Sequence, residues 1–259
     1  MPDSKPTFIW YELMTSHPDA AAAFYRSVVG WNTADAGQPD VQYTILSAGD
    51  RGIGGVMAIP AEAARAGARP AWLGYVGVPD TDDFAKRIVE AGGELHRAPE
   101  NIPNVGRFAV VADPGGAMFQ LLTPLPREEE PPRPEPGTPG LVGWHELVSS
   151  TGQEAAFAFY SGLFGWETAD LVDMGPIGKY RVFAADGVPI GGMMDKPAEA
   201  PASVWNFYIN VDGLDAAIGR IQVAGGQVVM GPHQVPGGSW IVQALDPQGA
   251  RFALVSARR

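Results

Sequence analysis

The sequence predicts an α+β protein that contains two copies of one module, each copy a pair of strand–helix–strand–strand–strand (βαβββ) units. The main observation is an internal repeat whose copies are separated by 133 to 137 residues, a period too long for a solenoid or propeller repeat. The second observation is that strand-like and helix-like patterns alternate in the same order within each copy. The repeated segments are WYEL (10–13) and WHEL (144–147), FYRSVVGW (24–31) and FYSGLFGW (159–166), GGVM (54–57) and GGMM (191–194), and DPGGA (113–117) and DPQGA (246–250).

The first half of each module predicts a strand, a helix and a hairpin. Residues 8–14 and 141–148 are rich in aromatic and branched side chains, which is typical of strands. The helix that follows has apolar residues four apart and ends at a glycine, Gly30 in the first copy and Gly165 in the second. Two short segments joined by a glycine-containing turn then indicate a hairpin, at 43–47 with 53–57 and at 179–184 with 190–194.

The second half of each module predicts the same order of elements. Strands are expected at 72–78 and 205–211, followed by helices that are capped near Asp80 or Asp212. The glycine pairs at 92–93 and 225–226 end these helices. A last hairpin turns at the Asp-Pro-x-Gly segment, with strands at 107–112 and 118–122 and at 239–245 and 251–255.

The composition indicates which partners the protein can have and in which cellular compartment it is expected. The chain has 259 residues, 46% of them apolar, a net charge of −11 and no cysteine. Such a charge repels nucleic acid and anionic membranes, so neither is expected as a partner. The lack of a disulfide framework, of a secretory leader and of a long apolar run predicts a cytoplasmic protein.

The domain boundary is expected in a proline- and glutamate-rich stretch. Residues 124–139 read PLPREEEPPRPEPGTP, typical of an extended spacer. We therefore predict a first module at 1–124, a linker at 125–139 and a second module at 140–259. The modules would pair within a monomer or across a homodimer.

Strand alternation predicts which side chains are available to a ligand. A twisted sheet with helices on its outer face leaves a concave inner face, which would form a cup for a small molecule. If Leu13 and Leu147 point toward the helices, their neighbours Glu12 and Glu146 point into the cups. The other expected cup residues are Trp10, Met57, Tyr75 and Gln120 in the first copy and Trp144, Met194, Asn206, Tyr208 and Arg251 in the second.

These motifs, in this order and in both copies, resemble the vicinal oxygen chelate superfamily. That superfamily includes glyoxalase I, the extradiol ring-cleavage dioxygenases and the bleomycin and fosfomycin resistance proteins. The Trp-x-Glu-Leu and Phe-Gly-Trp pairs look most like the two-module glyoxalase-like proteins of actinobacteria, which include a mycobacterial 27–30 kDa antigen and proteins described as hydroxylases. The resemblance implies the cup-shaped fold and small-molecule binding.

The resemblance also implies a metal site, and here the sequence departs from the pattern. Metal-binding relatives carry His or Gln on the first strand and Glu on the last, where this chain has Trp10 and Trp144, and Gln120 and Ala253. The middle-strand positions fall near Leu73 and Asn206. Because a divalent metal needs three or four converging donors, we expect no metal cofactor, with Fe, Mn, Ni or Zn held by other ligands as the alternative.

The sequence leaves three functions open. The first is a protein that binds a small, apolar or aromatic metabolite and transfers protons through Glu12 or Glu146, since an inward-facing carboxylate suits a general base or acid. The second is a metal-dependent glyoxalase I-type lyase or a ring-cleavage dioxygenase. The third is a non-catalytic, drug-sequestering resistance protein. Tryptophans 10 and 144 would stack on a flat ligand, and Arg251 would bind an anion or pair with Glu146.

Overall fold

A computed structural model describes residues 4–37, 41–126, 134–198, 200 and 202–259. The first half of the chain contains β1 (Phe8–Thr15), α1 (Pro18–Val29), β2 (Asn32–Asp35), β3 (Tyr43–Ala48), β4 (Arg51–Ala58), α2 (Ala61–Arg65), β5 (Ala71–Gly77), α3 (Thr81–Glu90), β6 (Glu94–Ile102), β7 (Gly106–Ala112) and β8 (Met118–Pro124). The second half contains β9 (Val142–Ser149), α4 (Gln153–Phe164), β10 (Glu167–Asp173), a 3₁₀ turn (Gly175–Ile177), β11 (Lys179–Ala185), β12 (Val188–Asp195), β13 (Val204–Asn210), α5 (Leu214–Val223), β14 (Gln227–Gln234), β15 (Trp240–Leu245) and β16 (Arg251–Ser256).

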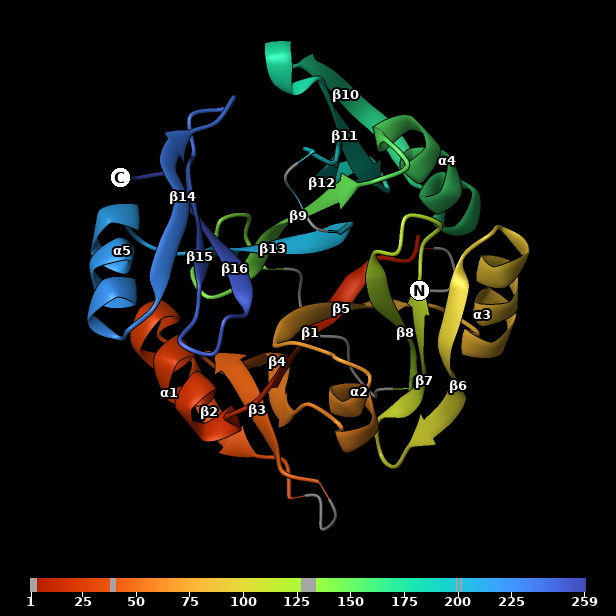
Figure 1. The fold of residues 1–259 in the computed structure, drawn as a ribbon, viewed down its shortest axis with the longest axis horizontal. Helices are drawn as coiled ribbons and strands as arrows, with labels where there is room; N and C mark the ends of the chain where they lie inside the picture. The colour runs from red at the N-terminus through yellow and green to blue at the C-terminus, as the bar shows by residue number, and fades with distance from the viewer. Residues whose placement is uncertain (1–3, 38–40, 127–133, 199, 201) are drawn as a thin grey trace. The chain divides into compact units, whose positions relative to one another are not determined.

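The predicted α+β class is confirmed, and the strands form two eight-stranded mixed sheets (Figure 1). One sheet contains the runs β2-β3-β4-β1 and β5-β8-β7-β6, and the other contains β10-β11-β12-β9 and β13-β16-β15-β14. Each run is one βαβββ unit in which the first strand pairs in parallel with the last and the other pairs are antiparallel. The repeated sequence therefore folds into four units of the same topology.

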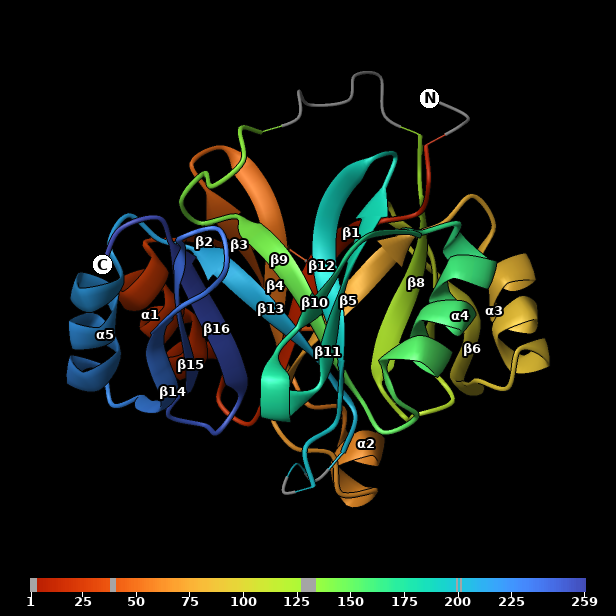
Figure 2. The ribbon, with the colours of Figure 1, turned by 90° about the horizontal axis from the view of Figure 1, so that it is seen from above.

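The four βαβββ units are grouped into two compact units that each combine both halves of the sequence. Unit 1 consists of residues 1–9, 74–132 and 144–205, and unit 2 of residues 10–73, 133–143 and 206–259. In unit 2 helix α1 lies beside α5, and in unit 1 helix α3 lies beside α4 (Figure 2). The boundaries 1–124, 125–139 and 140–259 stay a prediction, and residues 127–133 of the expected linker lie outside the described chain.

A buried Trp–Tyr–Asp hydrogen-bond chain joins the two sequence copies inside each unit. In unit 2 the Tyr25 hydroxyl accepts a bond from Trp72 Nε1 (2.8 Å) and donates to Asp246 Oδ2 (3.2 Å). In unit 1 the Tyr160 hydroxyl accepts from Trp205 Nε1 (3.0 Å) and donates to Asp113 Oδ2 (3.1 Å). The Phe-Tyr motif of each copy is thus bonded to the Asp-Pro turn of the other copy, which explains why both motifs recur.

The helix ends agree with the sequence at three positions and differ at one. Gly30 and Gly165 have left-handed backbone angles and cap α1 and α4, and the Asp80 side chain accepts a bond from Asp83 N (3.0 Å) at the start of α3. Helix α5 begins next to Asp212, as expected, but Gly213 occupies its N-cap and no side chain caps it. Among the described residues, no helix is long and apolar enough to cross a membrane.

Candidate functional site

The two faces of β1 divide the core from the candidate site. Tyr11 and Leu13 are buried on the face that packs on apolar side chains, and the Tyr11 ring meets Phe207 edge-on at 5.2 Å. Glu12 and Trp10 alternate with them and therefore lie on the opposite face. Glu12 is 4% exposed and Trp10 is half-buried.

A hydrogen-bond chain connects Trp10, Tyr43 and Glu12 on this opposite face. Trp10 Nε1 donates to the Tyr43 hydroxyl at 2.8 Å. The same hydroxyl is hydrogen-bonded to the Glu12 carboxylate. Because an indole nitrogen only donates and a carboxylate only accepts, the hydroxyl accepts from Trp10 and donates to Glu12. We call this set the first Trp–Tyr–Glu chain.

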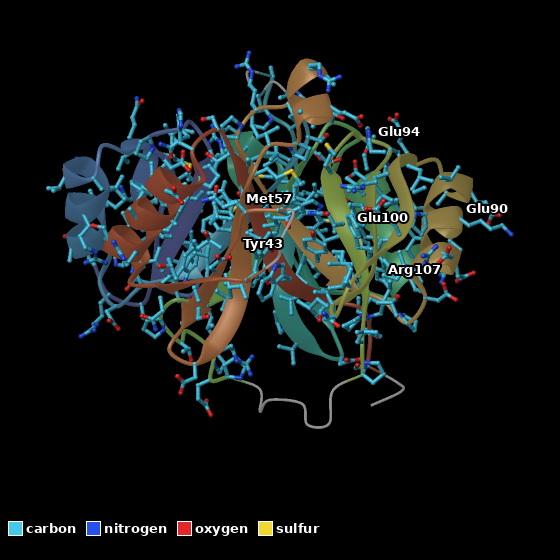
Figure 3. All side chains as sticks on the ribbon, turned by 90° about the horizontal axis from the view of Figure 1, so that it is seen from below. Tyr43, Met57, Glu90, Glu94, Glu100 and Arg107 are labelled. Atoms are coloured by element: carbon cyan, nitrogen blue, oxygen red, sulfur yellow. The ribbon has the colours of Figure 1, made fainter. Side chains whose placement is uncertain are left out.

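Gly55 makes this chain possible, because the Tyr43 ring lies directly over its Cα. Glu12 on β1 pairs with Gly55 on β4. Tyr43 on β3 pairs with Met57, two residues further along β4, and these two residues are labelled in Figure 3. A Cβ atom at Gly55 would lie 2.2 Å from Cζ and the hydroxyl oxygen of Tyr43. The missing side chain therefore lets a tyrosine from β3 reach across β4 to a glutamate on β1.

The second copy repeats the arrangement in unit 1. Trp144 Nε1 donates to the Tyr180 hydroxyl at 2.8 Å, and that hydroxyl donates to Glu146 Oε2 at 3.5 Å. Glu146 is 9% exposed and pairs with Gly192, whose Cβ would lie 2.1 Å from the Tyr180 ring. This second Trp–Tyr–Glu chain has the same donors, acceptors and glycine as the first.

Both tyrosines keep their protons at neutral pH. Burial raises the pKa of Tyr43 well above its ordinary value, and the nearby charge of Glu12 raises it further. Burial and the charge of Glu146 do the same to the pKa of Tyr180. Each tyrosine is therefore a stable O–H donor that holds a carboxylate oxygen in place.

The other predicted site residues fall on several strands. In unit 2, Met57 is half-buried beside Tyr43, and Asn206 and Tyr208 are buried on one face of β13. In unit 1, Met194 is half-buried and pairs with Tyr180, and Tyr75 pairs with Gln120 across β5 and β8. Within its own unit, each copy therefore brings one Trp, one Glu and one Met of the prediction together.

Arg251 belongs to a separate polar group in unit 2. Its Nη1 donates to Gln243 Oε1 at 3.0 Å, and Gln243 Nε2 donates to the Tyr208 hydroxyl at 2.8 Å. Gln243 and Tyr208 are 8% and 2% exposed, whereas Arg251 is exposed. Within unit 2, its side chain has no acidic partner among the residues that the structure describes. Glu146, the partner that the sequence also allowed, belongs to unit 1, so that pairing stays a prediction.

His145 is a core residue, in agreement with its alternation with Glu146. Its ring stacks on Phe8 at 4.6 Å, and Nδ1 lies 2.6 Å from the carbonyl oxygen of Ile190. Burial lowers the pKa of His145 to about 4, so the ring is neutral at neutral pH.

Comparison with known families agrees with this architecture. The family described as Glyoxalase/Bleomycin resistance protein/Dioxygenase superfamily matches residues 7–121 and 145–254, which is most of both copies. The chain belongs to this superfamily. The match confirms the resemblance that the motifs indicated. Because it covers two separate segments, it also confirms that the chain contains two modules of this family.

Similar proteins align with nearly the whole of this chain. A Mycobacterium tuberculosis protein named "Putative glyoxylase CFP32" is 29% identical over 95% of this chain and 93% of its own length. The anthracycline biosynthesis protein DnrV of Streptomyces peucetius is 30% identical over 96% of this chain and 92% of its own length. Among solved structures, the Mn(II)-bound glyoxalase of Novosphingobium aromaticivorans has a TM-score of 0.68 at 15% identity and covers 99% of this chain and 84% of its own. The dioxygenase LapB of Pseudomonas sp. KL28 has a TM-score of 0.62 at 14% identity and covers 97% and 91%, respectively.

The residues of this chain do not fit the metal that the family implies. Trp10 and Trp144, at the first-strand positions, use their indole N–H groups as donors to tyrosines. Ala253, at the last-strand position of the second copy, has only a methyl group, and Leu73 has no donor atom. In the described part of the chain, no three His, Cys, Asp or Glu side chains come close enough together to hold a metal ion.

Sequence reasoning missed Tyr43 and Tyr180, the central residues of both chains. Their signal is the spacing to the glycine pair: Tyr43 precedes Gly55, and Tyr180 precedes Gly192, by the same number of residues. Gln243 was missed as well, because nothing in its local sequence distinguishes it from any other polar residue on a strand.

Proposed function

We propose that this chain binds a small, apolar or aromatic metabolite against the face that carries each Trp–Tyr–Glu chain, and that Glu12 and Glu146 exchange a proton with it. The observation that carries the proposal is the duplicated bond order from indole to phenol to carboxylate, built across a glycine in both copies. Buried carboxylates with a fixed hydrogen-bond donor are expensive to maintain for packing alone.

The side chains around each carboxylate suit a flat, apolar ligand. Trp10 and Met57 are half-buried next to Tyr43, and Trp144 and Met194 are half-buried next to Tyr180. An indole ring offers a large stacking surface, and a methionine thioether adapts to different ring shapes. The relative named for anthracycline biosynthesis gives independent support, since anthracyclines are planar polycyclic aromatics.

In this proposal the proton transfer uses the chain's own residues. The carboxylate takes or returns a proton at the reacting carbon or oxygen of the ligand, which is general acid–base catalysis. The tyrosine O–H fixes one carboxylate oxygen, and the indole N–H fixes the tyrosine, so the chain orients the glutamate without taking part in the chemistry. No step requires a resident divalent metal.

The test begins with a thermal-shift screen of planar aromatic compounds, with and without added Mn, Fe, Ni and Zn. A ligand that binds the native state raises the melting temperature. The proposal expects ligands that stabilise the protein equally well without metal. Glu12→Gln with Glu146→Gln should then abolish turnover of such a ligand and retain its binding. Stabilisation that appears only with a stoichiometric metal would overturn the metal-free mechanism, and unchanged behaviour of the ligand in the double variant would leave sequestration as the function.

A further inference from the structure

Arg251 is a positively charged side chain held in place by a buried, uncharged support. A guanidinium group has only donors, so the Gln243 amide must direct its oxygen toward Arg251. Its nitrogen is thereby directed toward the Tyr208 hydroxyl, and both bonds are observed, at 3.0 and 2.8 Å. Because Gln243 and Tyr208 are more than nine-tenths buried, the support is built into the sheet.

The guanidinium charge is not neutralised by the protein in its described part. Arg107 and Arg259, by comparison, contact Asp82 and Asp215, whereas the hydrogen bond to the neutral Gln243 is the polar contact that the structure gives Arg251. Arg181 likewise bonds a buried glutamine, Gln153, but it also donates to Thr168 and lies over the Phe157 ring, whereas no such further contact is found for Arg251 in the described residues. An exposed guanidinium with free N–H groups is suited to bind a planar oxyanion with two parallel hydrogen bonds.

The equivalent positions of the first copy lack this group. In the second copy Tyr208 and Gln243 both pair with Ala253, two residues after Arg251. In the first copy Tyr75 and Val110 both pair with Gln120, two residues after Met118. The strand register therefore aligns Gln243 with Val110 and Arg251 with Met118. The cation and its support occur in one copy, whereas the Trp–Tyr–Glu chain occurs in both.

We propose that Arg251 is an anion-binding residue that gives the face formed by β13, β15 and β16 a preference for ligands with a carboxylate or a related oxyanion. The inference goes beyond the proposed function, since Arg251 lies on strands that carry neither Trp–Tyr–Glu chain. It also predicts that the two copies differ in ligand specificity. The first copy has the apolar Val110 and Met118 where the second copy has Gln243 and Arg251, so it should show no preference for anions.

The test compares three probes with the same aromatic body: 2-naphthoate, 2-naphthyl phosphate and the neutral 2-naphthamide. Binding to the full chain is measured by calorimetry. A charge-assisted pair predicts that at least one anion binds about tenfold more tightly than the amide. The more tightly bound anion identifies the oxyanion class.

Three variants locate the effect. Arg251→Gln keeps a donor for Gln243 but removes the charge, so the anion should bind about tenfold more weakly while the amide is unaffected. Gln243→Glu keeps Arg251 but places a carboxylate in hydrogen-bond range of it, and should abolish the preference equally. Met118→Ala, at the equivalent position of the first copy, is the matched control and should change nothing.

Equal binding of anions and amide to the wild-type protein, or a preference that survives Arg251→Gln, would overturn the anion site alone. The anion site is overturned as well if none of the three naphthyl probes binds. The proposed function is tested separately, by the thermal-shift screen and the Glu12→Gln, Glu146→Gln variant, so the two failures are distinguishable.

Discussion

Gly55→Ala is the substitution that tests the architecture of the candidate site most sharply. The new methyl group would lie 2.2 Å from Cζ and the hydroxyl oxygen of Tyr43, so the ring must leave its place. That movement breaks the bond from Trp10 Nε1 and the bond to Glu12. A neutral bond contributes about 1 kcal/mol and a bond to a charged group about 1.5–3 kcal/mol. Alanine also restricts the unfolded chain, which offsets about 0.5 kcal/mol of this cost, so we expect the free energy of unfolding to fall by about 2–3.5 kcal/mol.

The assay is chemical denaturation of Gly55→Ala, Tyr43→Ala and the double variant. With Tyr43 removed the methyl group has no ring to displace, so Gly55→Ala should cost less than about 0.5 kcal/mol in that background. Gly52→Ala on the same strand is the control, because its Cβ would lie 3.4 Å from Trp10, an ordinary contact. The reasoning is refuted if Gly55→Ala costs no more than Gly52→Ala, or if its cost is the same with and without Tyr43.

Three further predictions concern stability and metal content. Tyr25→Phe removes the hydroxyl between Trp72 and Asp246 and should cost about 3 kcal/mol in urea unfolding; a cost below about 0.5 kcal/mol would contradict a structural role for this bond. Folded His145 has a pKa of about 4, whereas the same side chain in the unfolded protein takes up its proton near pH 6.5. The free energy of unfolding should therefore fall by about 3 kcal/mol as the pH is lowered from 6.5 to 4. His145→Gln should remove this pH dependence of the free energy of unfolding. If the slope is unchanged in the variant, the pH dependence comes from other groups. Protein purified without a histidine tag should hold substoichiometric metal and keep its melting temperature in EDTA, and a drop in EDTA would indicate a structural or catalytic ion.

The parts of the fold that the sequence predicted well are those with a buried face. Strands β1, β5, β9 and β13 and the four longer helices have apolar residues at regular spacing, and their positions agree with the prediction to within a few residues. Trp31 and Trp166, which follow the ends of α1 and α4, are also core residues, 1% and 2% exposed. Burial on one face leaves a periodic pattern, and that pattern can be detected without a structure.

The strands that were not located individually are the polar ones. β2, β6, β10 and β14 lie at the ends of their runs, and most of their side chains are exposed. An edge strand with solvent on both faces has no apolar alternation, and its pairing depends on the backbone of its neighbour. Pro99 in β6 and Pro232 in β14 also make these segments hard to predict as strands. Proline has no N–H to donate to a neighbouring strand, so it argues against a strand unless the segment is known to lie at an edge.

The candidate site was predicted in part for a similar reason. Glu12, Glu146 and the two tryptophans follow from alternation on a single strand. Tyr43 joins them from a strand two places away in the sheet, and the contact depends on the register that sets Gly55 beneath its ring. Such register cannot be derived from a local pattern, because a shift by one residue would turn the tyrosine to the opposite face.

The most direct test of proton transfer by the Trp–Tyr–Glu chains is hydrogen exchange on a bound ligand. An aromatic ligand from the thermal-shift screen that carries an acidic C–H is incubated with the protein in D₂O, and deuterium incorporation is followed by NMR. Both proteins are compared at ligand concentrations that saturate them. We predict fast exchange with the wild-type protein, and exchange at the uncatalysed rate with the double variant Glu12→Gln, Glu146→Gln. Equal exchange with the two proteins, or none with the wild type, would contradict the account.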